Sequence, residues 1–347
     1  VSDEMLAIVD CSNEKIVNFY HTKSGDIVSN LEVSHRVEIK SIGLSEMGNG
    51  SEDKHLALID KSCDFWLYNL SNSTKFEERC AECFKLGVQV RAFKWSEKSG
   101  ILVCLGAENL SIFYFPEAAF IDAELFSDCT EKRKFSGSSA GSKVSFVGDK
   151  VEVKVNGRIE RVFFISPLSS SLQENFGKKR FERCLEICRL SNDLKIWTVL
   201  AALSIKNRKI DLSIEAFAMT KSADKLDFFK KLRKIAGKEE RNSEYAFFRN
   251  KTKEAEDILL QSSPPLVHRA LKLNIRQFKW ARALELAVRY DTHIDTVVAY
   301  RRRHMELTKG KERDENFIKY GENVNVDWRA VLGKEGDERG DGMLLDG

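Results

Sequence analysis

The sequence predicts a protein of two parts, strands arranged as part of a β-propeller and then helical hairpins arranged as an α-solenoid. From residue 1 to about 166, apolar residues alternate with polar ones, and Gly, Ser, Asn and Asp are frequent between the apolar segments. After residue 166 the apolar period lengthens to about 3.6 residues. Within this second part the pattern FERCLEIC at 181–188 returns as WARALELA at 280–287. A change of period and a repeated helical pattern together indicate two different architectures in one chain.

Length and composition fit this division. The 347 residues exceed what one hydrophobic core usually holds, and 42% hydrophobic with 31% charged residues excludes disorder of the whole chain. No apolar run approaches the ~18 residues of a membrane-spanning helix, so we expect no direct membrane insertion. The start, VSDEMLAIVD, lacks the regions of a secretory signal and begins with Val. We therefore expect a fragment whose true N-terminus lies upstream.

The charge is distributed unevenly between the two parts. Residues 1–170 hold 20 Lys and Arg against 25 Asp and Glu, and the remainder hold 36 against 28, which gives net charges of −5 and +8. A basic half can indicate an acidic partner or nucleic acid. The dense basic runs are confined to RRR at 301–303 and KKR at 178–180, so we interpret the rest as solvated helix faces. Aromatics among basic residues, as in RQFKWAR, are read as core at helical spacing, and we expect no nucleic-acid binding.

The first part contains a recurring hairpin. Its turn residues are separated by 50, 46 and 42 residues, and a further strand recurs with an offset of 51. A period of 40–50 residues with about four strands in each unit is typical of a WD-type β-propeller. Strict Gly-His and Trp-Asp dipeptides are missing, although Ser34-His35 and DFWLYNL at 64–70 occupy comparable places. The predicted hairpins are 6–20, 56–70, 101–115 and 144–155, with turns at Asp10, Asp60, Gly106 and Gly148 and further strands at 37–45 and 88–96.

The number of these units is too small for a ring. Propellers close with about four to eight blades, but some three and a half units fit into residues 1–166. Either blades are missing upstream, or a partner completes the surface. We favour missing blades and assign residues 1–166 to the C-terminal blades of the propeller.

The helical part is expected at 167–332, after Pro167 and three serines interrupt the strands. Helix starts are predicted after the capping residues Asp193, Asp211 and Ser222, and Gly237 is expected to close a helix. Pro264 and Pro265 are expected to open the helix LVHRALKLNI. The final residues 333–347, GKEGDERGDGMLLDG, hold five glycines and five acidic residues, and we expect them to be disordered.

The repeated eight-residue pattern describes one apolar stripe of a helix. Positions i, i+3, i+4 and i+7 are apolar or small in both copies, and weaker copies begin at Ile210 and Thr252, so that the four starts are 29, 42 and 28 residues apart. One hairpin buries too little apolar surface to offset the entropy of ordering it, so stacking on neighbours is required. We therefore favour a solenoid resembling tetratricopeptide repeats over a compact helical bundle. The matched positions are Phe181 with Trp280, Cys184 with Ala283, Leu185 with Leu284 and Cys188 with Ala287.

No catalytic, cofactor-binding or metal-binding residues are predicted. Cys80 and Cys83 in CAEC form one Cys-x-x-Cys pair, whereas a structural zinc site needs four ligands. The six histidines show no paired-ligand spacing, and His293 and His304 are expected to solvate helix ends. GSSAGSK at 137–143 lacks phosphate-loop spacing and is interpreted as a linker. The eight cysteines, several within apolar patterns, favour a reducing intracellular compartment.

Long segments of the sequence resemble one known family. NIRQFKWARALELAVRYDTHIDTVVAYRRRHME at 274–306 is closely similar to the C-terminal region of the intraflagellar transport protein 80 family, WD-repeat subunits of intraflagellar transport complex B. Further matching segments support the resemblance up to about residue 330. They are 1–16, 144–153, 196–210, 250–261 and 323–328. The ERCAECFK loop and the SPPLV turn depart from the family pattern, the latter at a helix boundary.

The resemblance implies a fold, a function and partners. Family members carry two propellers before the helices, so this chain would hold the later part of the second propeller and lack the first. The resemblance implies a non-enzymatic scaffold needed for cilium assembly, located at the cilium, its basal body and the cytoplasm. Its partners would be other complex B subunits, with the helical region a candidate for homodimer formation and no cofactor. Rival readings are a vesicle-coat or nuclear-pore scaffold, which shares this architecture, and a propeller enzyme with acidic or His residues converging on the channel.

Overall fold

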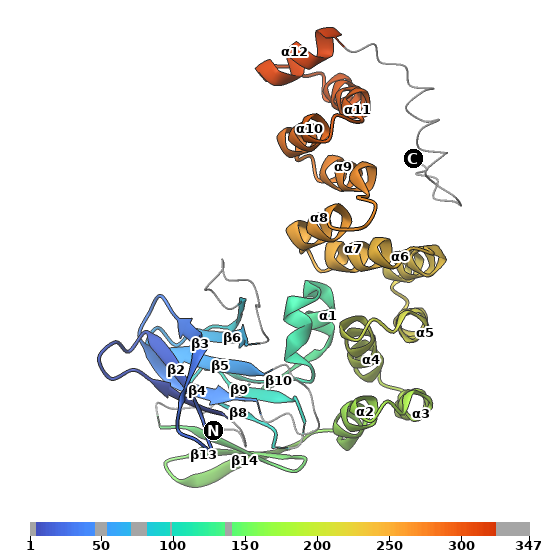
Figure 1. Ribbon diagram of the computed structural model, residues 1–347. Coiled ribbons are helices and arrows are strands. Elements are labelled where there is room, and N and C mark those ends of the chain that lie inside the picture. Colours follow the sequence, from blue (N-terminus) through green and yellow to red (C-terminus); the bar gives the residue numbers. More distant parts are fainter. Residues whose placement is uncertain (1–4, 46–53, 71–81, 98, 136–140, 324–347) are drawn as a thin grey trace. The chain divides into compact units, whose positions relative to one another are not determined.

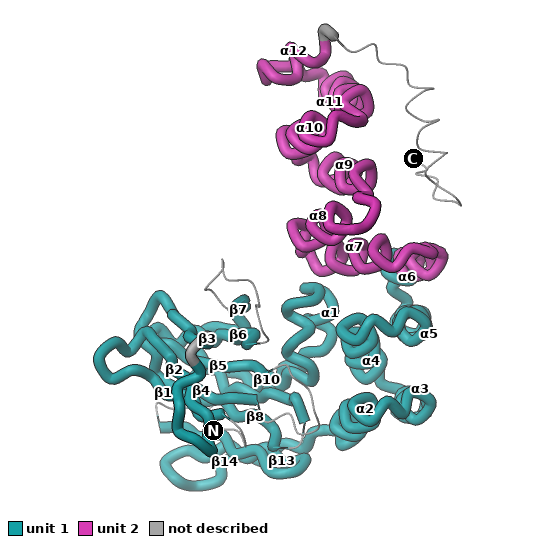
Figure 2. Tube along the Cα trace, viewed as in Figure 1, with its two compact units in different colours: residues 1–226 teal, residues 227–347 magenta. Residues whose placement is uncertain are grey.

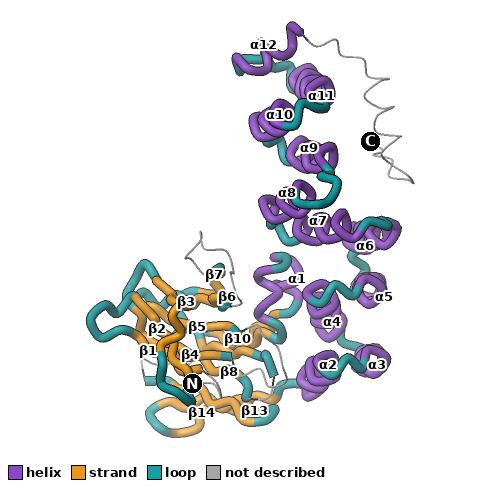
Figure 3. The backbone as a smooth tube through the Cα atoms, in the orientation of Figure 1, coloured by secondary structure: helices purple, strands orange, loops and turns teal. Residues whose placement is uncertain are grey.

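A computed structural model describes residues 5–45, 54–70, 82–97, 99–135 and 141–323 (Figure 1). Strands occupy the described chain up to Phe164, apart from one helical insertion, and helices occupy it from Pro167 onward (Figure 3). The expected tail at 333–347 lies outside the described residues. The strands are β1 Met5–Val9, β2 Ile16–His21, β3 Ile27–Ser34, β4 Ile39–Leu44, β5 His55–Asp60, β6 Phe65–Asn69, β7 Cys83–Gly87, β8 Ala92–Trp95, β9 Leu102–Leu105, β10 Asn109–Phe113, β11 Thr130–Lys134, β12 Lys143–Val147, β13 Lys150–Val155 and β14 Arg158–Phe164.

The described strands form four antiparallel sheets of consecutive strands. Two sheets have four strands, in the orders β4-β5-β6-β7 and β11-β10-β9-β8, and two have three, in the orders β1-β2-β3 and β12-β13-β14. The hairpins predicted from the turn residues are present, with Val9 opposite Val17 and Val147 opposite Lys150. Apolar residues of neighbouring sheets pack together, as where Val17 and Phe19 of β2 join Leu56 and Leu58 of β5 in one core. These are blades of a propeller, packed face to face.

A helical insertion between β10 and β11 was not foreseen. It consists of a 3₁₀ helix, η1 (Pro116–Phe120), and a short helix, α1 (Ala123–Asp128). The Asp122 side chain caps α1 by accepting a hydrogen bond from the Leu125 amide at 2.9 Å.

The helices of the second part follow one another with short connections. Asp193 caps its helix as predicted, by accepting from the Lys195 amide at 2.9 Å, and α6 begins directly after Ser222. The remaining helices are α2 Pro167–Gly177, α3 Phe181–Ser191, α4 Leu194–Lys206, α5 Ile210–Thr220, α6 Ala223–Lys234, α7 Lys238–Phe248, α8 Thr252–Leu260, α9 Val267–Arg276, α10 Trp280–Arg289, α11 Ile294–Leu307 and α12 Glu315–Asn323.

Three predicted helix boundaries are wrong. Helix α5 begins at Ile210 after Lys209, so Asp211 lies inside its first turn. There its negative charge interacts favourably with the positive end of the helix dipole. Gly237 precedes α7 and opens that helix, whereas the helix before it ends at Lys234. Helix α9 begins at Val267, two residues after the proline pair, and the Ser263-Pro264 peptide bond is cis.

Among the described helices, four pairs form hairpins, α2 with α3, α4 with α5, α7 with α8, and α9 with α10. Helix α6 stands between the second and third hairpins. It accounts for the long 42-residue interval between the second and third copies of the repeated pattern, where the other intervals are 29 and 28. The irregular spacing thus reflects one added helix in an otherwise regular series.

The chain divides into two compact units, residues 1–226 and 227–347 (Figure 2). This division into compact units falls inside α6, because the first helices pack closely on the last blades, whereas the change from strands to helices lies between Phe164 and Pro167. None of the described helices is long and apolar enough to cross a membrane.

Within the first unit, one side chain of α2 is bonded at two points to the β8–β11 sheet and the loops that flank it. Gln173 accepts a hydrogen bond from the Gly100 amide at 2.9 Å and donates one to the Tyr114 carbonyl at 2.6 Å. Both partners are backbone groups, so the contact depends on the backbone conformation at Gly100 and Tyr114 and not on their side chains. It fixes the first helical hairpin against this blade.

The helical insertion is the second attachment point. Lys206 of α4 is paired with Glu117 of η1, and Lys225 at the start of α6 bonds to Asp122 at 2.9 Å and Glu124 at 2.6 Å. Lys225 is buried, and a buried ammonium group requires such partners. The insertion is therefore a platform on which helices α4 and α6 are held.

Candidate functional site

The four hairpins share one turn geometry. Between the two helices of each hairpin, a residue with φ between 55° and 58° lies in the left-handed region, and the next residue caps the second helix. The amide of that capping residue bonds back to a carbonyl five residues earlier, at 2.8–3.0 Å, which satisfies one of the free carbonyls at the end of the first helix. The left-handed residues are Lys179, Arg208, Asn250 and Phe278, and the capping residues are Arg180, Lys209, Lys251 and Lys279.

The residue at the third position after the start of each second helix is small and fully buried. These four residues are 0% exposed, and they are the positions at which the repeated sequence pattern requires a small side chain. A small residue lets the neighbouring helix approach closely, so that the large residues before and after it can pack. The four residues are Cys184, Ser213, Ala255 and Ala283.

Neighbouring hairpins are joined by an equivalent contact in both units. In the first unit, the Lys209 ammonium lies 5.1 Å from the centroid of the Phe181 ring, and in the second, Lys279 Nζ bonds to Thr252 Oγ1 at 3.0 Å. In each case the lysine caps one second helix, and its partner is the first residue of the second helix in the preceding hairpin. The repeated sequence therefore encodes a repeated contact between modules.

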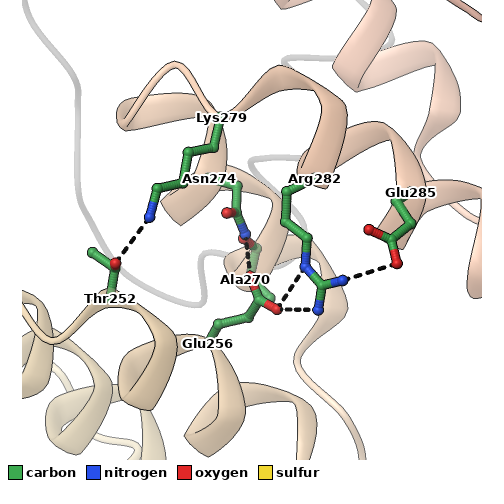
Figure 4. Close-up of polar contacts among 7 residues, drawn as sticks. All are labelled: Thr252, Glu256, Ala270, Asn274, Lys279, Arg282 and Glu285. Atoms are coloured by element: carbon green, nitrogen blue, oxygen red, sulfur yellow. Dashed lines mark hydrogen bonds and ion pairs between the residues drawn. The ribbon is translucent and has the colours of Figure 1, made fainter.

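A buried polar network joins helices α8, α9 and α10 (Figure 4). Glu256 of α8 is 7% exposed, and its Oε1 accepts hydrogen bonds from Arg282 of α10 at 3.0 and 2.6 Å. Its Oε2 accepts from the Asn274 amide of α9 at 2.7 Å. Arg282 also donates to Glu285 at 2.9 Å, and the bonds to Glu256 and Glu285 raise the pKa of its guanidinium. The Glu256 carboxylate is thus bonded to both α9 and α10, which makes the stack specific in register.

The apolar stripe of the repeat lies in the core of the second unit. Ala283, Leu284 and Ala287 pack with Val297 of α11 and Phe317 of α12, and Trp280 lies against the same cluster. An open groove of about 480 Å³ runs beside Leu284 and is bordered by Phe317 and Tyr320. Neither stripe points into solvent, since Cys184, Leu185 and Leu284 are all buried.

His35 contacts the 64–70 segment. His35 lies 2.6 Å from Tyr68 Oη and 3.3 Å from Asp60 Oδ2. Trp66 donates to the same Asp60 oxygen at 3.2 Å, and the Asp64 amide donates to Asp60 Oδ1 at 2.9 Å. These bonds connect His35 to the turn and the two strands that contain Asp60, Trp66 and Tyr68, so the histidine contributes to holding this sheet together.

The other sequence features are dispersed. Cys83 begins β7 and is exposed, while Cys80 and most of the 137–143 segment lie outside the described residues. No group of three or more metal-ligating side chains occurs within the described ranges. His293 caps α11, as its expected place at a helix end requires, and its ring lies 4.8 Å from that of His268.

An aromatic cluster at the α9–α10 turn was missed. Phe278, Trp280 of α10 and His304 of α11 lie with ring centroids 5.0–6.1 Å apart. Phe278 is 63% exposed. The signal was present in the RQFKWAR segment, but the interpretation of all its aromatics as core was wrong for Phe278, because that residue lies in the turn and not on the helix.

These features define the class: blades of a β-propeller followed by stacked helical hairpins. The comparisons agree, since the family described as IFT80 second beta-propeller matches residues 1–167 and the family described as IFT80/172/WDR35/WDR19 TPR domain matches residues 196–341. Neither is an enzyme family. The chain is an intraflagellar transport protein 80-like protein.

Individual relatives support this assignment. The chain is 30% identical over 337 residues to the intraflagellar transport protein 80 homolog of Rattus norvegicus and 29% identical to that of Mus musculus, in each case over 96% of this chain and 42% of the relative. It is 21% identical to WD repeat-containing protein 19 of Homo sapiens over 78% of this chain and 20% of that protein. The chain thus spans about two fifths of the length of the first two relatives.

Proposed function

We propose that the chain is part of a non-enzymatic scaffold of the intraflagellar transport B complex, which acts in cilium assembly through protein-protein contacts. The observation that carries the proposal is the repeated hairpin contact, in which Lys209 meets Phe181 and Lys279 meets Thr252. Repeats that are joined only to their neighbours form extended surfaces, and such surfaces bind other proteins. The names of the rat and mouse relatives, both intraflagellar transport protein 80 homologs, support the ciliary setting.

The partners proposed are other complex B subunits, and the location proposed is the cilium with its basal body and the cytoplasm. We also propose the helical region as a site of homodimer formation, because the groove beside Leu284 leaves apolar side chains of α10 and α12 open at the end of the described array. Solenoids commonly present such concave surfaces to partners. No nucleic acid and no direct membrane insertion are proposed.

The test is affinity purification of the tagged full-length protein from ciliated cells, with imaging of the same tag. Recovery of intraflagellar transport subunits and a signal along cilia is the expected result. A matched variant, Leu284→Asp, should lose those partners that bind the helical region and keep those that bind the blades. Recovery of vesicle-coat or nuclear-pore subunits, with a signal at Golgi membranes or the nuclear envelope, would overturn the proposal in favour of the rival scaffold class.

A further inference from the structure

The four hairpin turns provide an internal comparison that singles out one residue. At the exposed left-handed position the first three hairpins have Lys179, Arg208 and Asn250, which suit a solvated turn, whereas the fourth has Phe278. A bulky apolar residue with φ of 58° is strained, and its 63% exposure gives no compensating burial within the chain. Strain combined with exposure is typical of a residue kept for an interaction.

Phe278 is part of a larger apolar surface. Its ring lies 5.0 Å from that of His304, and Leu307, one helical turn further along α11, is 76% exposed. Trp280 packs against the same surface, since its ring centroid lies 5.3 Å from that of His304 and 5.4 Å from the Arg301 guanidinium. We name Phe278, Trp280, His304 and Leu307 the turn patch.

The surroundings of the turn patch are strongly basic. The two segments that form it, 276–280 and 301–311, contain seven Lys and Arg against a single acidic residue, Glu306. Glu306 is two positions past His304, which places it on the opposite side of α11. Arg303 is four positions before Leu307 and thus lies beside it on the same face. Arg276 is paired with Glu244 at 3.2 Å, and Arg301 is paired with Glu312 at 2.7 and 3.1 Å.

We propose that the turn patch binds an acidic segment of another protein, one that places an aromatic or aliphatic side chain on Phe278 and Leu307. Charge complementarity selects an acidic occupant, and two exposed apolar residues select an apolar anchor. A nucleic acid fits less well, because stacking of successive bases needs separate aromatic platforms. Here the rings are tilted by 39–54° and packed on one another. The inference deepens the proposed scaffold role and rests on it.

The test measures fluorescence anisotropy of labelled peptides with the whole 347-residue chain. The probe is a peptide of about 15 residues, long enough to span the patch when extended, made of Asp, Glu, Ser and Gly with a Phe and, three positions later, a Leu. Two further probes replace its acidic residues by Lys or its Phe and Leu by Ala. We expect the first probe alone to bind, and its affinity to fall as sodium chloride is added.

Phe278→Gly separates binding from folding. Glycine adopts the left-handed conformation without strain, so this variant should melt at or above the wild-type temperature while it binds the first probe at least about tenfold more weakly. Leu307→Ser should also weaken binding. The matched control is Leu190→Ser, since Leu190 is an equally exposed leucine, 78%, near the end of α3 in the other unit. That control should bind as the wild type does.

Several outcomes would overturn the inference. Two of them are equal binding of the Lys probe and wild-type affinity in Phe278→Gly. A third is tighter binding of a poly-uridine oligonucleotide that Phe278→Gly abolishes. The fourth is a dimer in sedimentation that Phe278→Gly dissociates, since the patch would then be covered by a second copy of the chain. None of these would alter which subunits the full-length protein recovers from ciliated cells, so failure here is distinct from failure of the proposed function.

Discussion

Arg282 Nη2 lies 2.6 Å from Glu256 Oε1, and this ion pair joins the second helices of two successive hairpins. Glu256 is buried, with 7% exposure, whereas the Arg282 side chain is 39% exposed and reaches Glu256 from the surface. A pair of this kind sets the register between modules, since a shift of either helix would leave a carboxylate without its partner.

Arg282→Met should destabilise the second unit by about 2–3 kcal/mol, because the buried Glu256 carboxylate would keep only its bond to Asn274. Chemical denaturation monitored by circular dichroism measures the loss. The matched control is Arg183→Met, which breaks the exposed Arg183–Glu186 pair at 2.6 Å and should cost less than about 1 kcal/mol. Equal losses in the two variants would mean that burial of Glu256 contributes nothing.

Leu284→Asp should cost several kcal/mol, about 3 or more, because it places an unpaired carboxylate among Ala283, Ala287 and Phe317. The midpoint of thermal unfolding and the helical signal report the effect. Leu194→Asp is the control, since Leu194 is 61% exposed at the start of α4. A Leu284→Asp chain with wild-type helicity and melting would contradict the stacked arrangement of hairpins.

Asp60→Ala should destabilise its blade by about 3 kcal/mol, because His35, Trp66 and the Asp64 amide would all lose their acceptor in a buried site. Tryptophan fluorescence reports the change directly through Trp66. Asp26→Ala, at an exposed turn, should change stability by less than about 0.5 kcal/mol. If the two alanine variants unfold at the same denaturant concentration, the network does not hold the blade.

Lowering the pH should loosen α12 before the rest of the second unit. Hydrogen bonds from Arg301, opposed by desolvation and aided by the amides of Asp314 and Arg313, lower the pKa of Glu312 to about 2. Because the folded pKa lies below the ordinary value of 4.5, the stabilisation is complete above pH 4.5 and is lost as the pH falls toward 2. Carboxyl carbon NMR shifts measure the titration, and Glu312→Gln should abolish this dependence. A Glu312 titration midpoint near 4.5 in the folded chain would refute the ion pair.

The overall architecture could be predicted because it is written in repeated patterns. Turn residues such as Asp10 and Gly148 mark hairpins, and small residues such as Ala283 mark the places where helices touch. Local boundaries were harder, because competing signals have similar strength. Asp211 is a good capping residue by type, but the left-handed turn at Arg208 makes Lys209 the cap, so α5 starts at Ile210, two residues earlier than predicted.

The contacts between distant segments could not be predicted at all. Lys225 and Asp122 are 103 residues apart, and neither belongs to a motif. The exposure of Phe278 could not be predicted from the sequence, because it depends on the conformation of the turn in the folded chain. Periodicity reports which face of an element is apolar, and it carries no information about side chains in connections.

The platform formed by η1 and α1 has a mechanical consequence for the first unit. Glu117, Asp122 and Glu124 are bonded to lysines that belong to α4 and α6, far along the chain from the blade that carries the platform. Force applied to that blade would thus reach the helices through three ion pairs in parallel, and not only along the single peptide strand near residue 165. Tension across this unit would be shared, and the links under load would be charge pairs, whose strength falls as ionic strength rises.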